Sequence, residues 1–429
     1  MSNQSKPDVS AFIGRTNHRN IRLKFGIRKA DRRYHMFLIG QTGTGKTSLL
    51  ENLIVQDMTN GEGVAVLDPH GDLVERLIKQ IPEHRQKDLI FFDVPDPECP
   101  FGFNPLESVP PSKRALAASE MIEAFKKIWE KTWGPRMEHI LRNCLLTLLE
   151  QPKATLADIN KLFRDDSFLQ KCLTNVTNPE VRDFWMKEFA NFSFKFRSEI
   201  VQPIQNKVGA FLSDPTLYRV LTQSERTFDI RKALDEGRIV LVNLAKGKLG
   251  GDNASLLGAL LVSRIGLGAL SRADQPEEAR RDFYLYIDEF QNFTTLSMVN
   301  ILSELRKYRL NMVIANQYLD QLEPEIKDAV LGNVGNIISF RVGLNDAKVL
   351  EKVFSPEFSQ TDLVNLSNHS VYLRLMIDGS VSKPFSAETL PPKIFGLQAI
   401  ARFTSLCARF WGWARRRKGH HRESLSNSV

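Results

Sequence analysis

The chain carries, at residues 40–47, the sequence Gly40-Gln41-Thr42-Gly43-Thr44-Gly45-Lys46-Thr47, which fits the pattern G-x-x-x-x-G-K-[ST] at every position. The apolar residues 36–39 before it predict a buried strand, and residues 48–55 after it predict a helix. Glycines let backbone N–H groups surround a phosphate, and a helix N-terminus adds partial positive charge. The motif in this setting predicts a nucleotide-binding loop.

The last residues of this loop have distinct predicted roles. We expect Lys46 to reach the β- and γ-phosphates and the hydroxyl of Thr47 to bind Mg²⁺. Residues 40–48, from Gly40 to Ser48, are the predicted nucleotide-contacting segment. The predicted ligands are ATP and Mg²⁺.

A second nucleotide motif is the apolar run 283–287, which ends in Asp288 and Glu289. Asp288 is predicted to hold Mg²⁺, directly or through water. Glu289 is predicted to orient and polarise the attacking water, and an acid directly after the aspartate is typical of one class of ATPases. The alternative for Glu289 is a solvated carboxylate at the end of a strand.

Two more polar residues end predicted strands. Gln317 follows the apolar run 312–315 and is predicted to sense the γ-phosphate between the two motifs; alternatively, it only begins the next loop. Asp68 ends the run 63–68, at the strand edge where nucleotides bind in α/β proteins. It either supports the metal or the attacking water, or it caps the helix that begins near Asp72.

Arginines often neutralise charge during phosphoryl transfer, commonly from a neighbouring subunit. Arg306 and Arg309 lie on a predicted helix before the Gln317 strand and are the main candidates. Arg32, Arg33 and Arg341 are further candidates. Each of them is alternatively a surface or salt-bridge residue.

Composition places the chain among ordinary globular proteins, with 429 residues, 42% hydrophobic and 25% charged. No uncharged apolar run approaches the roughly 20 residues of a membrane helix, so we expect no transmembrane segment. The four cysteines lack metal or disulfide spacing, which favours a cytoplasmic protein. The net charge of +8 is uneven: residues 1–33 and 391–429 each carry +7, and residues 34–390 carry −6. Any nucleic-acid contact is therefore expected to be local.

The order of predicted elements indicates an α/β fold with a mostly parallel sheet, because strands alternate with helices. Residues 1–19 are predicted to be a flexible basic N-terminus. The ATPase core is predicted at 20–110 and 227–392, with a strand over 20–27. Apolar residues at helical spacing predict an inserted all-α domain at 111–226. Residues 393–429 are predicted to be a basic tail, with an amphipathic helix at 394–413.

Six stretches together resemble the HerA/FtsK superfamily of ring-shaped DNA-pumping ATPases, and most closely the type IV secretion (conjugative) coupling proteins. They are GQTGTGKT at 40–47, VAVLDPHGDL at 64–73, FGFNPL at 101–106, WGPRMEHILRN at 133–143, YIDEF at 286–290 and LRKYRLNMVIANQYLDQL at 305–322. They span about residues 20–390.

The resemblance implies a RecA-like core and an ATP-hydrolysing, DNA-translocating motor, usually a homohexamer with the helical insertion on the pore side. It maps Lys46, Thr47, Asp68, Asp288, Glu289 and Gln317 onto the family's nucleotide-site positions, and Arg306 or Arg309 onto its arginine region. It implies membrane-associated secretion partners and a position in the cytoplasm or at the inner face of the membrane. The alternative is an ATPase that powers protein secretion or assembly without a nucleic-acid substrate.

Overall fold

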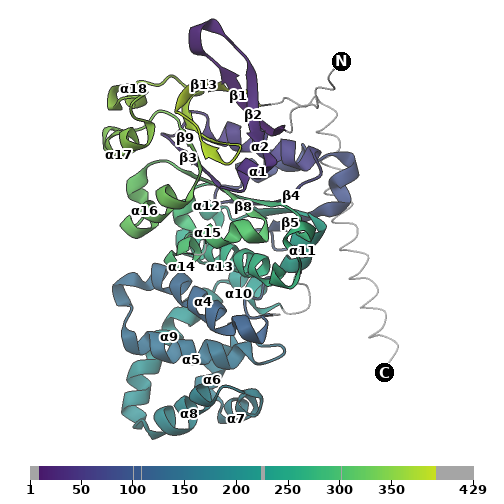
Figure 1. Cartoon of the computed structure of the whole chain (residues 1–429). Helices are drawn as coiled ribbons and strands as arrows, with labels where there is room; N and C mark the ends of the chain where they lie inside the picture. Colours follow the sequence, from purple (N-terminus) through teal and green to yellow (C-terminus); the bar gives the residue numbers. More distant parts are fainter. Residues whose placement is uncertain (1–8, 100, 108, 224–227, 301, 393–429) are drawn as a thin grey trace.

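The computed structural model describes residues 9–392 except 100, 108, 224–227 and 301. Its centre is one eleven-stranded sheet (Figure 1). The strands are, in sheet order, β2 (Lys24–Arg28), β1 (Val9–Thr16), β13 (Phe385–Thr389), β10 (Ser370–Arg374), β9 (Asn336–Ser339), β3 (Met36–Ile39), β8 (Leu310–Asn316), β7 (Phe283–Ile287), β4 (Gly63–Asp68), β6 (Ile239–Asn243) and β5 (Leu89–Asp93). A two-stranded sheet pairs β11 (Met376–Ile377) with β12 (Ser380–Val381).

Helices connect these strands. They are α1 (Lys29–Arg32), α2 (Lys46–Thr59), α3 (Asp72–Ile78), α4 (Arg114–Trp129), α5 (Pro135–Leu149), α6 (Asp158–Arg164), α7 (Asp166–Asn175), α8 (Pro179–Asp183), α9 (Phe194–Leu212), α10 (Pro215–Thr222), α11 (Ile230–Glu236), α12 (Lys246–Leu249), α13 (Gly251–Leu270), α14 (Leu296–Asn300), α15 (Leu302–Leu305), α16 (Pro324–Asn333), α17 (Leu344–Phe354) and α18 (Gln360–Val364).

The strands from β9 to β5 in sheet order are all parallel, and the strands from β2 to β10 extend the sheet in the antiparallel sense. Strands β3, β4 and β7 have the predicted bounds, because a strand buried on both faces leaves a continuous apolar run. The predicted α/β fold with a mostly parallel sheet is confirmed.

Alternation along each strand separates two apolar cores. On β3, Met36 and Leu38 pack with the buried residues of α2 and α3. Phe37 and Ile39 point to the opposite face and join the core that contains α4 and α13. The sheet is therefore covered by helices on both faces, and the P-loop helix α2 lies on the face away from the helical segment.

Helices α4 to α10 lie between β5 and β6 and form the lower half of the view in Figure 1. Helix α4 packs against α13, which lies under the sheet. One apolar core continues from the sheet through α13 into these helices. We refer to residues 111–222 as the helical segment, and its status as a separate domain stays a prediction.

The prediction of a flexible N-terminus is wrong for the residues from Val9 onward. Strand β1 pairs with β13 and β2, and its alternating residues Ala11 and Ile13 are fully buried. Strand β2 begins at Lys24, four residues later than predicted. The basic tail 393–429, the helix predicted at 394–413 and residues 1–8 lie outside the described residues.

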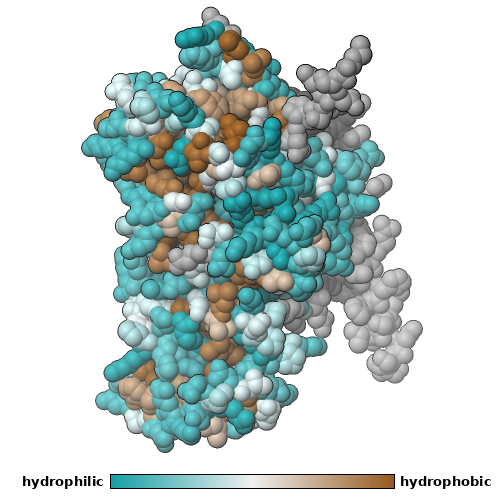
Figure 2. Space-filling model, viewed as in Figure 1, coloured by the Kyte–Doolittle hydropathy of each residue, from teal (hydrophilic) through white to brown (hydrophobic). Residues whose placement is uncertain are grey.

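Helix α13 and the four residues after it are long and apolar enough to cross a membrane, but 78% of their most apolar window is buried inside the protein. This stretch therefore lies in the core of the protein. Figure 2 shows a face on which polar residues dominate and apolar residues gather in separate patches.

The contact between α4 and α13 contains a buried acid, Glu120, which is 1% exposed. Ser263 of α13 donates a hydrogen bond to Oε2 of Glu120, and Oε1 has no hydrogen-bond partner among the described residues. Burial raises the pKa of Glu120 to about 7, against the opposing effects of Ser263 and Arg264. Glu120 is therefore protonated in the folded protein at mildly acidic pH.

We expect the free energy of unfolding to fall by about 3 kcal/mol as the pH rises from about 4.5 to about 7 through this one group. In this window the folded protein keeps the proton of Glu120 and the unfolded chain loses it. Glu120→Gln removes this contribution. Urea denaturation of both proteins at about pH 4.5 and about pH 8 tests it; parallel pH dependence in the two proteins would contradict the assignment.

Candidate nucleotide site

The phosphate-binding loop turns from the end of β3 into the start of α2, at the carboxyl edge of the parallel strands. Gly43 and Gly45 have φ values of 78° and 119°, a region that glycine adopts without strain. A Cβ at Gly45 would also lie 2.8 Å from Nδ1 of His369. A Cβ at Gly43 would meet no atom within 4 Å, so the loop is open on that side.

Lys46 is the first residue of α2 and is 7% exposed. Its ammonium donates to the carbonyl oxygens of Gly40 and Gln41, the second at 3.1 Å. Burial lowers the pKa of Lys46, and the charges of Asp288 and Glu289 partly offset this. The cation thus lies against the loop, and its acceptors are carbonyl oxygens that phosphate oxygens can replace.

Thr47 and Asp288 come together, as predicted for a magnesium site. Oγ1 of Thr47 lies 3.4 Å from Oδ2 of Asp288, which follows β7. Burial, Glu289 and Asp68 raise the pKa of Asp288 to about 6, and Lys46 opposes this. Among the described residues no group of three or more His, Cys, Asp or Glu is arranged to hold a metal by itself. The pair fits Mg²⁺ bound jointly with phosphate and water.

Glu289 is held in one orientation by two amide side chains. Gln317 donates to its Oε1 at 2.7 Å, and Gln291 donates to its Oε2 at 2.6 Å. Glu289 is 7% exposed and has a φ of 51°, a left-handed conformation that costs energy in a residue other than glycine. The sheet therefore brings the predicted residues Glu289 and Gln317 into direct contact.

Asp68 acts as a cap in this structure. It is 1% exposed, and its two carboxylate oxygens accept hydrogen bonds from the backbone N–H groups of His70, at 2.9 Å, and Val74, at 3.1 Å. These hydrogen bonds match the capping role that was one of the two alternatives for Asp68. Its charge still contributes to the raised pKa of Asp288.

Arg306 and Arg309 lie at the opposite edge of the sheet from the phosphate-binding loop. Arg309 directly precedes β8, whose other end pairs with the end of β3. Its guanidinium lies 3.3 Å from Glu277, and that of Arg306 lies 3.6 Å from the ring of Tyr34. The predicted helix is wrong at this point: Arg306 begins a 3₁₀ turn, and Arg309, with a φ of 58°, turns the chain into the strand.

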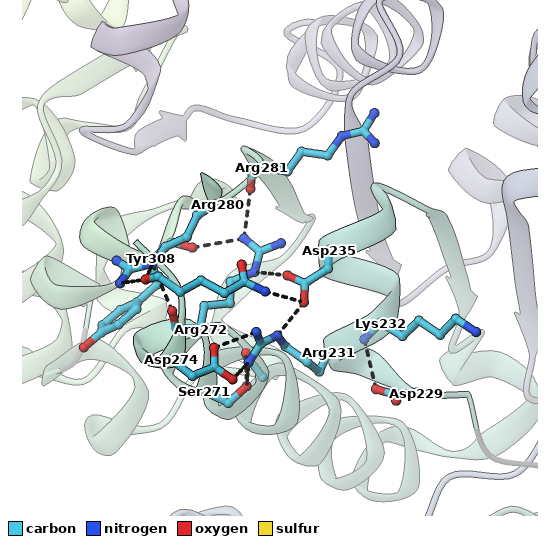
Figure 3. Close-up of polar contacts among 12 residues, drawn as sticks. Asp229, Arg231, Lys232, Asp235, Ser271, Arg272, Asp274, Arg280, Arg281 and Tyr308 are labelled. Carbon is cyan, nitrogen blue, oxygen red and sulfur yellow. Dashed lines mark hydrogen bonds and ion pairs between the residues drawn. The ribbon is translucent and has the colours of Figure 1, made fainter. Parts of the chain in front are cut away.

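A buried arginine network fixes this opposite edge (Figure 3). Arg272 is fully buried, and its Nε donates to Asp235 at 2.9 Å. Its Nη1 donates to the carbonyl oxygens of Arg281, at 2.9 Å, and Tyr308, at 3.0 Å. Because Tyr308 belongs to the 3₁₀ turn of Arg306, Arg272 ties that turn to the sheet.

The other arginine candidates also have structural partners. Arg32 pairs with the buried Asp57, and Arg33 pairs with Asp282. Arg341 is the one beside the phosphate-binding loop, where its Nε donates to the side chain of Gln41 at 3.2 Å. Arg306 and Arg309 lie at the other end of β8 and do not contact the phosphate-binding loop of this chain.

Sequence reasoning missed Gln291, which connects Glu289 to the strand β8. Its Oε1 accepts a hydrogen bond from Asn316 at 2.8 Å. It lies two residues after Glu289, in the 3₁₀ turn Phe290–Asn292. An amide side chain two residues after a predicted general base was a usable signal in the sequence.

A family model described as "Type IV secretion-system coupling protein DNA-binding domain" matches residues 24–343. The chain belongs to this family. The resemblance to coupling proteins is therefore confirmed, and the matched range contains both nucleotide motifs and the whole helical segment. A search of curated proteins gives no match.

Two solved structures have a similar fold. The chain is similar to "Plasmid coupling protein TrwB in complex with ADP and Mg2+", with 17% identity, a TM-score of 0.63, and coverage of 92% of this chain and 91% of that one. It is also similar to VirB4 of Thermoanaerobacter pseudethanolicus, with 12% identity, a TM-score of 0.63, and coverage of 93% and 100%. These likenesses show that the chain shares its fold with both solved structures.

Proposed function

We propose that the chain is an Mg²⁺-dependent ATPase that moves DNA in the manner of a type IV secretion coupling protein. One observation carries the proposal: Glu289 is oriented by Gln317 and Gln291 beside the loop that contains Lys46. A buried, oriented carboxylate next to a P-loop is suited to accept a proton from an attacking water. Membership in the coupling-protein family supports DNA as the substrate.

Each residue has a defined part in this mechanism. Lys46 would exchange its contacts with the carbonyl oxygens of Gly40 and Gln41 for phosphate oxygens. Thr47 and Asp288 would hold Mg²⁺, which when bound neutralises phosphate charge. Glu289 orients the water, and Gln317 keeps the carboxylate in place and senses the γ-phosphate.

The assembly proposed is a homohexamer with ATP bound between subunits. Arg306 or Arg309 would then act on the site of the neighbour, since both lie at the edge of the sheet away from their own site. Arg306 is the better candidate, because Arg309 is 13% exposed in its side chain and faces Glu277 and Asp282. Membrane-associated secretion partners and a cytoplasmic position, free or at the inner face of the membrane, complete the proposal.

For the DNA contact we propose the part of the helical segment around the start of α9. Phe194 is 89% exposed there, followed by the exposed Lys195, and Met186 nearby in the chain is 56% exposed. Nearby in the chain lies a hollow of about 380 Å³, lined by residues of α5 and α9, among them Arg136 and Phe196, and by Glu188 and Phe192. Exposed aromatic rings next to cations bind nucleic-acid bases by stacking and phosphates by charge.

Phe194→Ala is expected to weaken binding of single-stranded DNA about tenfold, because the loss of one stacking ring costs on the order of 1–3 kcal/mol. Tyr218→Ala is the matched control, since Tyr218 is an exposed aromatic residue of α10 in the same segment. Fluorescence anisotropy with a labelled oligonucleotide measures both. Equal affinities of the two variants would exclude Phe194 from the DNA contact.

The whole proposal is tested by steady-state ATP hydrolysis without DNA, with single-stranded DNA and with duplex DNA. We expect Mg²⁺-dependent hydrolysis that rises with DNA. Lys46→Ala should abolish it, because Lys46 is the cation at the loop. Hydrolysis indifferent to DNA at low salt would contradict the motor and favour the alternative, an ATPase for protein secretion or assembly.

A further inference from the structure

Lys127 lies on α4 and reaches the segment that follows Glu289. Its ammonium donates hydrogen bonds to the carbonyl oxygens of Gln291 and Thr294, both at 2.6 Å. Burial lowers the pKa of Lys127 to about 8, and Glu323 partly offsets this, so the side chain is mainly a cation at neutral pH. One charged side chain of the helical segment thus contacts the turn next to the proposed general base.

The residue that Lys127 holds by its backbone is the residue that holds Glu289 by its side chain. Gln291 donates to Oε2 of Glu289 at 2.6 Å and accepts from Asn316 at 2.8 Å. A continuous series of hydrogen bonds therefore runs from α4 through Gln291 to the carboxylate of Glu289. Nothing in the nucleotide motifs themselves provides this connection.

Two buried aromatic residues also hold the turn after Glu289 in place, independently of Lys127. Phe290 and Phe293 are 0% and 1% exposed. The ring of Phe293 packs so closely on α13 that a Cβ at Gly258 would lie 2.1 Å from it. Loss of Lys127 therefore leaves the turn buried in place and removes the contacts that set the direction of its polar groups.

We propose that Lys127 is a positioning residue for Glu289, through which the helical segment controls the water-activating carboxylate. A displacement of α4 moves the carbonyl oxygens of Gln291 and Thr294, and with them the amide that orients Glu289. This rests on the proposed function of Glu289. It goes beyond that function because it names the contact by which DNA on the helical segment alters the hydrolysis rate.

The test compares Lys127→Met, Lys127→Arg and the control Lys126→Met. Methionine keeps the length and apolar part of the side chain without its donors, and arginine keeps donors for two carbonyl oxygens. Lys126 is the neighbouring, exposed lysine of the same helix and pairs only weakly with Glu123, at 3.9 Å. If Lys127→Met does not fold, Lys127→Gln, which keeps one amide donor group, is measured in its place.

For Lys127→Met we expect kcat for ATP hydrolysis to fall about 10- to 100-fold with KM unchanged, the effect of a misplaced catalytic group. Lys127→Arg should recover most of the rate, and Lys126→Met should match wild type. In the nucleotide-free protein, hydrogen exchange of the peptides covering 289–295 should be faster in Lys127→Met alone. This second readout needs no hydrolysis.

The inference is overturned if Lys127→Met keeps the wild-type kcat, or if exchange of residues 289–295 is unchanged. It is also overturned if Lys126→Met loses as much activity as Lys127→Met. The outcome differs from failure of the proposed function: a protein whose hydrolysis ignores DNA can still show the Lys127 effect on its basal rate and on exchange.

Discussion

Glu289→Gln is expected to reduce kcat for ATP hydrolysis about 10³-fold while nucleotide affinity stays near that of wild type. Loss of a general base costs on the order of 10²–10⁴ in rate. Glutamine has nearly the same shape: its oxygen can accept from Gln291, and its NH₂ group can donate to Gln317 once the amide of Gln317 turns over, so the site keeps its geometry. What the variant loses is the negative charge that accepts the proton.

Two measurements are needed, steady-state hydrolysis and equilibrium binding of a fluorescent nucleotide. Glu304→Gln is a suitable control, because Glu304 is an exposed acid of α15 away from the site. Its rate should equal that of wild type. If Glu289→Gln hydrolyses ATP normally, then the carboxylate is not the base and the assignment of the whole second motif must change.

Arg32→Met is expected to lower the free energy of unfolding by about 3–5 kcal/mol, because it leaves a buried carboxylate without its cation. Arg32 and Asp57 have side chains that are 1% and 0% exposed, with contacts of 2.5 and 2.8 Å. Arg32 also donates to the hydroxyl of Tyr286 at 2.8 Å. Burial alone lowers the pKa of Arg32, but Asp57 and Tyr286 raise it above its ordinary value.

This ion pair connects three elements of the core: α1, which precedes β3, the P-loop helix α2, and β7. Chemical denaturation followed by circular dichroism measures the loss. The double variant Arg32→Met/Asp57→Leu should recover most of it, since a buried ion pair can often be replaced by apolar side chains. Arg28→Met, which breaks the exposed pair with Asp378, should cost less than about 1 kcal/mol. A loss no larger in Arg32→Met than in Arg28→Met would contradict the argument.

The central strands could be predicted because each of them is a continuous apolar run that can be recognised in the sequence by itself. Residues 36–39, 63–68 and 283–287 are apolar throughout and need no knowledge of their neighbours. That Glu289 and Gln317 lie near each other could also be predicted, because each residue lies just after a parallel strand at the same edge of the sheet. The polar residues at the ends of the predicted strands thus indicated the edge of the sheet at which the proposed site lies.

What could not be predicted depends on residues distant in sequence. Only half of the residues of strand β1 are apolar, and its burial comes from a partner strand that ends at residue 389. Gln291 and Lys127 belong to no recognisable motif. They were not predicted because their proposed role depends on contacts between α4 and the turn after β7. Arg306 and Arg309 lie close to the Gln317 strand in sequence, but at its far end.

The pairing of β1 with β13 has a consequence for synthesis of the chain. Gly14 is opposite Thr389, so the first of the described strands to be synthesised pairs with the last of them. At about 5–20 residues per second, roughly 20 to 75 s separate the two. During that interval the hairpin of β1 and β2 can form, but the edge of β1 that later pairs with β13 has no neighbour. The nascent chain therefore keeps this edge of β1 unpaired until β13 has been synthesised, and an unpaired strand edge can pair with other chains.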